Sequence, residues 1–153
     1  MRARCLAVCL VLVTGCARDD GRSKADFIAD ADAACAAANV RIAGLGPLRP
    51  ALFAVSEQRR GLERWFSGFV QTLGDNLAEL EALVPPDDDD GELDRALFDS
   101  RERVLSHASE TLALVRANGT PVASSRGVGL GEAISAVRDP ALAYGFEDCA
   151  QIG

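Results

Sequence analysis

Cysteine is the residue type in this chain whose chemistry and placement are most informative. The sequence has 153 residues and five cysteines, of which Cys5, Cys9 and Cys16 lie at the N-terminal end. The other two, Cys35 and Cys149, lie near the two ends of the remaining chain. A thiol can carry a lipid, ligate a metal or form a disulfide, so the residues around each cysteine must decide between these reactions.

The segment that holds the first three cysteines has the pattern of an export signal. Arg2 and Arg4 provide a basic start, and residues 5–13 form an apolar run of nine residues. A membrane-spanning helix needs ~20 apolar residues, whereas a run of this length is typical of a secretory signal. The run ends in Val13-Thr14-Gly15-Cys16, which is an aliphatic residue, two small residues and a cysteine.

This arrangement resembles the lipobox of bacterial lipoproteins. The resemblance implies diacylglycerol on Cys16, cleavage by signal peptidase II after Gly15, and a further acyl group such as palmitate on the new N-terminus. The alternatives are an ordinary secretory signal with an incidental cysteine and an uncleaved membrane anchor. We expect residues 1–15 to be a removed signal peptide, residues 16–23 a lipidated tether, and residues 24–153 one helical domain.

The expected location is the cell envelope, where the lipid on Cys16 would hold the exported chain to the cell membrane. In a host with two membranes, Ala17 rather than an aspartate after the cysteine resembles outer-membrane sorting. The formal net charge is −7, and it becomes more negative once Arg2 and Arg4 are removed. Such a surface repels nucleic acid and anionic lipid headgroups, so we expect no nucleic-acid partner and membrane contact through the lipid.

The two cysteines of the mature chain are expected to form a disulfide. An even pair of cysteines in an exported protein is typical of a disulfide, because the compartment is oxidising. The alternative is that Cys35 and Cys149 are two unrelated buried thiols. A zinc site is not expected, since the two cysteines and His107, the one histidine, do not complete a tetrahedral shell without a carboxylate.

Apolar residues at three- and four-residue spacing predict four helices, over about 23–43, 51–84, 91–118 and 130–143. The stripes of the first three are Phe27, Ile28, Ala31, Ala34, Cys35, Ala38 and Ile42; Leu62, Phe66, Phe69, Leu73, Leu77, Leu80 and Val84; and Leu93, Leu97, Val104, Leu105, Ala108, Leu112 and Val115. No segment alternates as a strand does. We therefore predict an all-α fold, a four-helix bundle-like domain closed by one disulfide.

The predicted helix ends carry the residues that stop or start helices. Ser23 and Asp26 form a capping pair at the first helix. Pro85 and Pro86 end the second helix, and Asn118 with the glycine after it is a plausible cap for the third. Pro140 is expected to break or bend the last helix.

Two short motifs support this arrangement. They are Ala31-Asp32-Ala33-Ala34-Cys35 in the first helix and Tyr144-Gly145-Phe146-Glu147-Asp148-Cys149 at the end of the chain. The pair resembles a group of small helical lipoproteins of actinobacteria. The resemblance implies the helical fold and the pairing of the two cysteines, and it implies no particular activity.

The acidic run Asp87–Asp90 and the glycines near residue 129 were the other candidates for binding sites. An EF-hand loop that places Gly91 at position 6 would have Pro86 at position 1 and Leu97 at position 12, so the motif fails. A looser cation site remains the alternative to a role in solubility and helix-dipole stabilisation. Gly127-x-Gly129-x-Gly131 lacks the preceding strand and the lysine of a phosphate loop, so no phosphate site is expected.

The sequence shows no motif typical of a catalytic site. His107 falls on the polar side of its helix, and neighbouring serines lack the spacing of a nucleophile, so a surface position is expected. Arg60, Arg64 and Trp65 form the one basic–aromatic cluster and are the candidate partner-binding patch. The alternative is that these arginines pair with nearby glutamates, namely Glu57 and Glu63, while the tryptophan is half-buried.

The expected function is therefore a binding role without catalysis or a cofactor. The leading hypothesis is a lipid-anchored cell-envelope protein whose helical domain binds an envelope protein partner or scaffolds a complex. The alternative is a small-molecule or ion-binding envelope lipoprotein. A pocket with convergent polar groups would favour the alternative, and a continuous exposed apolar or arginine–aromatic patch would favour the partner-binding hypothesis.

Overall fold

The structure is a computed structural model of the chain, and it describes residues 22–47, 56–87, 89, 91–118 and 129–153. The described part is an all-α bundle, which confirms the predicted fold class. In chain order its elements are α1 (Lys24–Gly44), α2 (Ser56–Glu81), η2 (Asp94–Phe98), α3 (Asp99–Asn118), a helical segment over residues 129–135, and α5 (Arg138–Tyr144).

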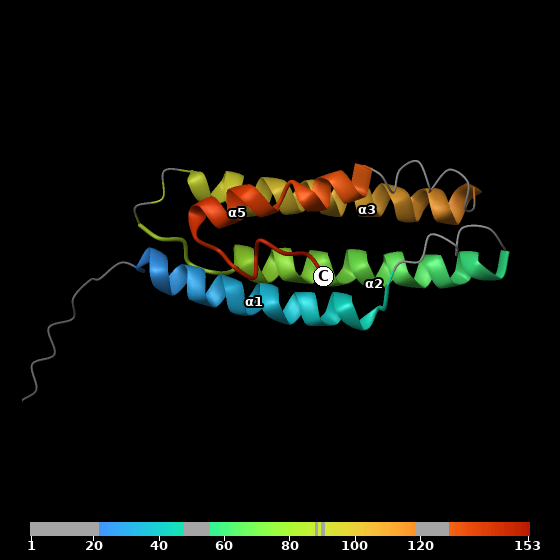
Figure 1. The fold of residues 1–153 in the computed structure, drawn as a ribbon, viewed down its shortest axis with the longest axis horizontal. Helices are drawn as coiled ribbons and strands as arrows, with labels where there is room; N and C mark the ends of the chain where they lie inside the picture. The colour runs from blue at the N-terminus through green and yellow to red at the C-terminus, as the bar shows by residue number, and fades with distance from the viewer. Residues whose placement is uncertain (1–21, 48–55, 88, 90, 119–128) are drawn as a thin grey trace, which may run out of the picture.

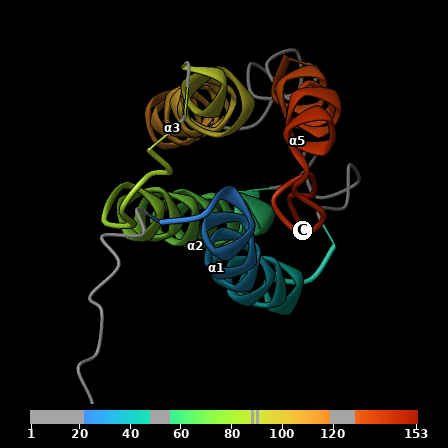
Figure 2. The same ribbon diagram turned by 90° about the vertical axis from the view of Figure 1, so that its left-hand side faces the viewer.

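The helices form two layers. In Figure 1, α1 and α2 lie side by side in the lower layer, and α3 and α5 form the upper one. The view along the bundle in Figure 2 shows the same four helices around a common centre. The C-terminal tail, residues 145–153, runs from α5 in the upper layer down to α1. None of the helices within the described residues is long and apolar enough to cross a membrane.

The start of α1 follows the capping chemistry that the sequence predicts. Ser23 is the N-cap, and its hydroxyl accepts a hydrogen bond of 3.1 Å from the backbone N–H of Asp26. The same hydroxyl donates to the carboxylate of Asp26 at 2.6 Å. This pair satisfies a backbone donor that the first helical turn would otherwise leave unbonded, and it fixes where the helix begins.

The end of α2 differs from the prediction. The helix ends at Glu81, and Val84, which the apolar stripe included, is 63% exposed. The physical reason is Pro85, because a proline disfavours helical backbone in the residue before it and donates no hydrogen bond of its own. The predicted start of this helix, residues 51–55, lies outside the described residues.

The third predicted helix begins as a π-helix, which the apolar spacing did not indicate. η2 spans Asp94–Phe98 and continues directly into α3. Just before it, a carboxylate oxygen of Asp89 accepts a hydrogen bond of 3.1 Å from the backbone N–H of Leu93. Asp89 of the acidic run thus caps a helix start, as expected for a carboxylate near a helix N-terminus.

The last predicted helix is broken in two. Residues 129–135 are helical, Ala136 and Val137 form a turn, and α5 follows. The break lies four residues before Pro140, because a proline has no N–H to donate to the carbonyl four positions earlier and its ring displaces that carbonyl. Gly145 ends α5 with φ of 117°, a left-handed conformation that favours glycine.

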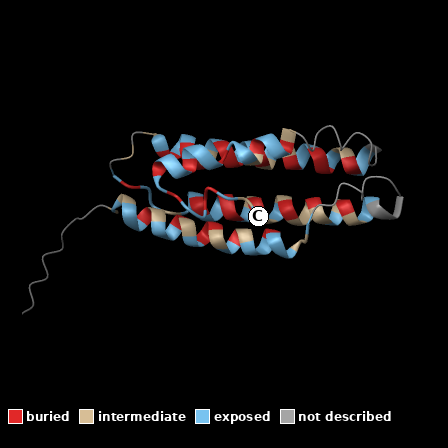
Figure 3. Ribbon diagram, viewed as in Figure 1, coloured by how far each residue is buried: buried red, intermediate tan, exposed pale blue. Residues whose placement is uncertain are grey.

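The buried side chains divide into two apolar clusters along the bundle, seen as red bands on the facing sides of the helices in Figure 3. The first cluster holds Phe27, Ala31, Ala34, Cys35, Leu80, Leu93, Ala96, Leu97, Ala141, Tyr144, Phe146, Cys149 and Ala150. The second holds Ile42, Leu62, Phe66, Phe69, Leu73, Val104, Ala108, Leu112, Val115, Leu130, Ala133 and Val137. Helices α1 and α2 contribute to both clusters, whereas η2 and α5 contribute to the first and α3 to the second. Buried polar side chains lie between the two clusters.

Candidate functional site

The predicted disulfide is present and lies at this boundary. Cys35 of α1 and Cys149 of the tail are bonded, with their Cα atoms 5.0 Å apart and both residues fully buried. This distance lies inside the ~7 Å within which a bridge can close. The pairing of the two cysteines is confirmed, and the alternative of two unrelated thiols is wrong.

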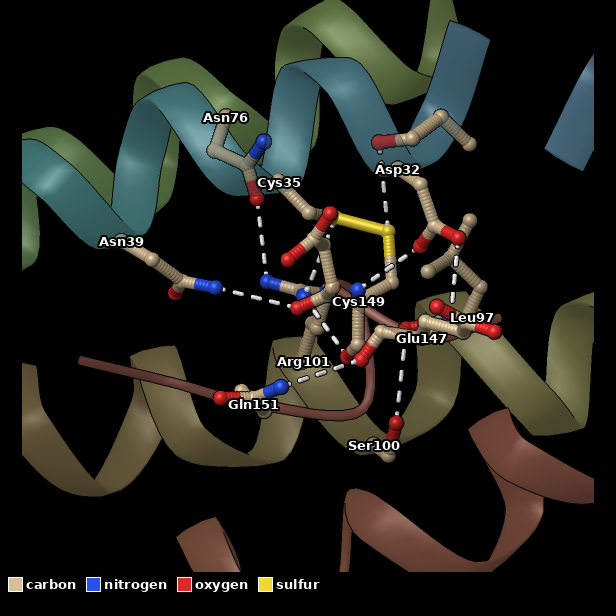
Figure 4. The surroundings of a disulfide bond; sticks show 12 residues. Asp32, Cys35, Asn39, Asn76, Leu97, Ser100, Arg101, Glu147, Cys149 and Gln151 are labelled. Atoms are coloured by element: carbon tan, nitrogen blue, oxygen red, sulfur yellow. Dashed lines mark hydrogen bonds between the residues drawn. A yellow bond between two sulfur atoms is a disulfide. The ribbon is translucent and has the colours of Figure 1, made fainter. Parts of the chain in front are cut away.

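Side chains of α1 on the same face as Cys35 hold the tail by its backbone. The two carboxylate oxygens of Asp32 accept hydrogen bonds of 2.9 Å from the backbone N–H groups of Glu147 and Cys149. One turn beyond the disulfide, the amide of Asn39 donates to the carbonyl of residue 148 and accepts from the N–H of residue 153. Figure 4 shows the bonds of Asp32 and the bond donated by Asn39 around the yellow disulfide. The tail has no regular structure, so these contacts substitute for the backbone bonds that a helix would supply.

The side chain of Arg101, in α3 of the opposite layer, also reaches the disulfide and the tail. Its Nη1 donates to the side-chain oxygen of Asn76 in α2 at 3.0 Å, and its Nη2 donates to the carbonyl of Cys149 at 2.9 Å. Nη2 also lies 3.2 Å from the sulfur of Cys35. The guanidinium thus connects α2, α3, α1 and the tail (Figure 4).

Burial makes this position costly for a cation. Arg101 is only 1% exposed, and desolvation by burial lowers its pKa to about 10, while the nearby carboxylate of Asp32 raises it. Within the described residues, Nε of Arg101 and Nδ2 of Asn76 make no hydrogen bond. A guanidinium with a pKa of about 10 is still charged at neutral pH, so it acts as a structural cation at the disulfide.

Sequence reasoning missed both Arg101 and Asn76, although the apolar stripes contain a signal. Through η2 and α3 the stripe steps from Leu97 to Val104, and Arg101 occupies the turn between them on the buried face. In α2, Asn76 lies three residues after Leu73 and beside Leu77, on the same buried face. A polar residue on the apolar face of a helix is a candidate for a buried polar contact.

A separate pocket opens near Trp65, within the second cluster. Its volume is about 380 Å³. The lining comes from the C-terminal end of α1 and the residues after it, from α2, from the segment 129–135 and from the tail. The lining residues are Ile42, Ala43, Gly46, Pro47, Trp65, Phe69, Leu130, Gly131, Ile134, Ile152 and Gly153.

Trp65 is fixed in place at the wall of this pocket. Its indole N–H donates a hydrogen bond of 2.9 Å to the carbonyl of Gly46, and its ring stacks on Phe69 with centroids 5.1 Å apart. The side chain is half-buried, as the sequence alternative expected. Because its one polar atom is already bonded, Trp65 presents only its aromatic surface to the pocket.

The predicted arginine–aromatic patch is divided by the helix. Arg60 and Arg64 are exposed, whereas the neighbouring Trp65 turns to the pocket. Glu63 pairs with Arg116 of α3 at 3.1 Å, and the side chain of Glu57 lies outside the described residues. The structure therefore separates the tryptophan from the two arginines.

A second hollow of about 550 Å³ adjoins the pocket at Ile134. The two cavities share three lining residues, Ile134, Ile152 and Gly153. The second hollow is more polar, and its further lining residues are Ser135, Arg138, Leu142, Glu147, Ala150 and Gln151. An apolar pocket thus opens on one side toward charged and amide side chains.

Of the remaining sequence candidates, His107 and Gly129 line neither of these two cavities. His107 is half-buried, and a Cβ at Gly129 would lie 4.0 Å from its ring. In the described part of the chain no three His, Cys, Asp or Glu side chains are placed to ligate a metal. Asp88 and Asp90 of the acidic run, and Gly127 of the glycine motif, lie outside that part.

The lipobox and its cysteine, Cys16, also lie outside the described residues, so the resemblance to bacterial lipoproteins stays a prediction. The resemblance to the small helical lipoproteins of actinobacteria also stays a prediction, except for the helical fold and the cysteine pair. Compared with known proteins, this chain matches no protein-family model, no curated protein and no solved structure.

Proposed function

We propose that this protein is a lipid-anchored envelope protein without catalytic activity that binds a small apolar ligand in the Trp65 pocket. The observation that carries the proposal is the pocket itself. Its volume of about 380 Å³ falls within the range of small-molecule sites, roughly 300–1,000 Å³. Its lining is aliphatic, aromatic or glycine throughout the eleven residues that form it.

The chemistry of the lining favours binding over reaction. No lining residue carries a nucleophile or a titratable side chain, and the indole N–H of Trp65 is already bonded to Gly46. A polar group inserted here would lose its hydrogen bonds to water without gaining others, whereas a hydrocarbon would gain by leaving water. The buried part of the ligand is therefore hydrocarbon.

The position of the pocket suits an anchored protein. The tether leads into the first residue of α1, Lys24, whereas the pocket lies at the other end of that helix, at Ile42. At 1.5 Å per residue these two points are about 27 Å apart. A lipid on Cys16 would thus attach the domain at the end of α1 opposite to the pocket.

Binding of a protein partner is the second candidate function. Arg60 and Arg64 are one helical turn apart, both are exposed, and neither forms an ion pair with a described residue. On a protein of net charge −7 they form a local basic strip that an acidic partner would contact. This candidate predicts that Arg60→Glu abolishes capture of a partner and leaves the pocket unaffected.

Trp65 allows a direct test, because it is the single tryptophan of the chain. Residues 17–153 contain the whole described core, whose first residue is Phe27. In this chain, 1-decanol added below its solubility limit should change the intrinsic fluorescence of Trp65 saturably. A signal that rises linearly with concentration, without saturation, would argue against a binding site.

Two leucine substitutions make a matched pair for this titration. A Cβ at Gly131 would meet nothing within 4 Å, so the leucine of Gly131→Leu can begin without a clash and extend at the pocket wall. Gly74→Leu is the same change in α2, also with nothing within 4 Å and away from the pocket. Binding of 1-decanol should be lost in Gly131→Leu and kept in Gly74→Leu. Equal binding by both variants would place the ligand elsewhere and refute the proposed site.

A further inference from the structure

The Trp65 pocket and the polar hollow lie next to each other. Ile134, Ile152 and Gly153 line both cavities, so a molecule seated against Trp65 has the polar hollow within reach past Ile134. The first part is lined by hydrocarbon and the second part by polar and charged side chains. A ligand that matches both parts is an amphiphile, with a hydrocarbon body and a polar head.

The polar hollow has one strong hydrogen-bond donor that is not already in use. The hydroxyl of Ser135 donates to the carbonyl of Gly131 at 2.9 Å, and the amide of Gln151 lies 3.5 Å from the carbonyl of Glu147. Arg138, the first residue of α5, is exposed and forms no ion pair with any residue that the structure places. Its planar guanidinium matches a carboxylate in shape and charge.

We propose that the ligand is a monoanionic amphiphile, a single hydrocarbon chain that lies in the Trp65 pocket with its carboxylate against Arg138. The inference rests on the proposed function and adds the chemical class of the ligand. Binding both ends at once explains why the apolar pocket needs no polar group of its own.

The acidic character of the protein limits the charge of this head. Glu147 lines the same hollow, and the chain as a whole carries a net charge of −7. Charges farther than about 8 Å are largely screened at physiological ionic strength, so the adjacent Arg138 decides the sign of the preferred head. The carboxylate of Glu147 disfavours a second negative charge on the ligand, which selects a carboxylate over a dianionic phosphate.

The test compares three probes with the same ten-carbon chain and different heads, in residues 17–153 by Trp65 fluorescence. The probes are decanoate and decyltrimethylammonium, used below the concentrations at which they form micelles, and 1-decanol, used below its solubility limit. Decanoate should bind about tenfold more tightly than either other probe, which corresponds to about 1.4 kcal/mol. Arg138→Gln should remove this preference, whereas Arg103→Gln, an exposed arginine of α3 away from both cavities, should preserve it.

The outcomes separate this inference from the proposed function. If all three probes bind equally and Gly131→Leu abolishes their binding, the pocket stands and the anionic class is wrong. If the ammonium probe binds most tightly, or if Arg138→Gln keeps the decanoate preference, the assignment of Arg138 is wrong. If no probe changes the fluorescence saturably, both the inference and the proposed function fail.

Discussion

Arg101 donates a hydrogen bond of 2.9 Å to the carbonyl oxygen of Cys149, although both residues are almost completely buried. The disulfide holds the tail to α1, and this bond holds the same residue to α3 on the other side. Cys149 is thus attached to both layers of the bundle. The tail residues that line the pocket, Ile152 and Gly153, follow it directly, so the pocket wall depends on this attachment.

Arg101→Met should destabilise the domain by about 2–4 kcal/mol, because it leaves the buried oxygens of Asn76 and Cys149 without a donor. Urea denaturation of residues 17–153 measures this loss. Arg103→Met, an exposed arginine of the same helix, is the matched control and should change stability by less than about 0.5 kcal/mol. Equal effects of the two changes would show that the buried contacts contribute nothing.

The cost of Arg101→Met should be the same at pH 6 and pH 8.5. Burial lowers the pKa of Arg101 to about 10, so below pH 9 the guanidinium is charged in the folded and the unfolded chain alike. When the pH rises through about 10, the folded chain loses the proton of Arg101 before the unfolded chain does. The free energy of unfolding therefore increases with pH in that range. Denaturation curves at the two pH values check this, and a cost that falls by 1 kcal/mol or more would contradict it.

Asp32→Ala should destabilise the domain by about 1–3 kcal/mol, because two backbone N–H groups of the tail lose their acceptor. The amides of Glu147 and Cys149 should then exchange with solvent faster, while amides within α2 keep their rates. Asp75→Ala, an exposed aspartate of α2, removes the same charge without a tail contact. Hydrogen exchange that is unchanged in Asp32→Ala would show that the disulfide alone holds the tail.

Cys35→Ser should lower stability by about 2–4 kcal/mol, since the bridge closes a long loop with a sequence separation of 114. Thermal unfolding followed by circular dichroism measures the change, with most of the helical signal retained below the transition. The same variant should bind 1-decanol more weakly, because the tail supplies Ile152 and Gly153 to the pocket. Undiminished binding would show that the tail stays in place without its covalent link.

Cys16 should be the acylated first residue of the mature protein. Two or more acyl chains anchor a protein stably, whereas one chain binds a bilayer only marginally. Mass spectrometry of the protein from its own cells should find residues 1–15 missing and lipid on Cys16. Cys16→Ser should accumulate as an unprocessed precursor. Normal lipid labelling of that variant would contradict the assignment of Cys16 as the acylated residue.

Much of the fold followed from periodicity because helices bury regular stripes. The Ser23 cap, the α1 stripe and the cysteine pair were all predicted from residue type and spacing. The prediction that Val84 belongs to the buried stripe of α2 was wrong. A stripe records apolar spacing alone, and the backbone restriction imposed by the following proline overrode it. The π-helical start at Asp94 was missed because one additional residue per turn barely alters a short apolar pattern.

The candidate site was harder to predict, because its parts come from segments distant in sequence. Trp65 was singled out with Arg60 and Arg64 as its neighbours, since adjacency in the chain was the available signal. The residues that actually surround it, such as Ile42 and Ile152, reach it only through tertiary packing. Arg101 carried no distinguishing motif, and a charged residue on a helix is usually exposed, so its burial could not be inferred without the position of its partners.

The link between Cys35 and Cys149 also has a mechanical consequence. A pulling force applied between Arg22 and Gly153 would run along α1 to Cys35, cross the sulfur atoms, and leave through the last few residues. The long loop between the two cysteines, which includes α2, α3 and α5, would bear no load. Stretched at its ends, the molecule would lengthen only by the short segments outside the loop, and the rest of the bundle would be shielded from tension until a reductant opened the bond.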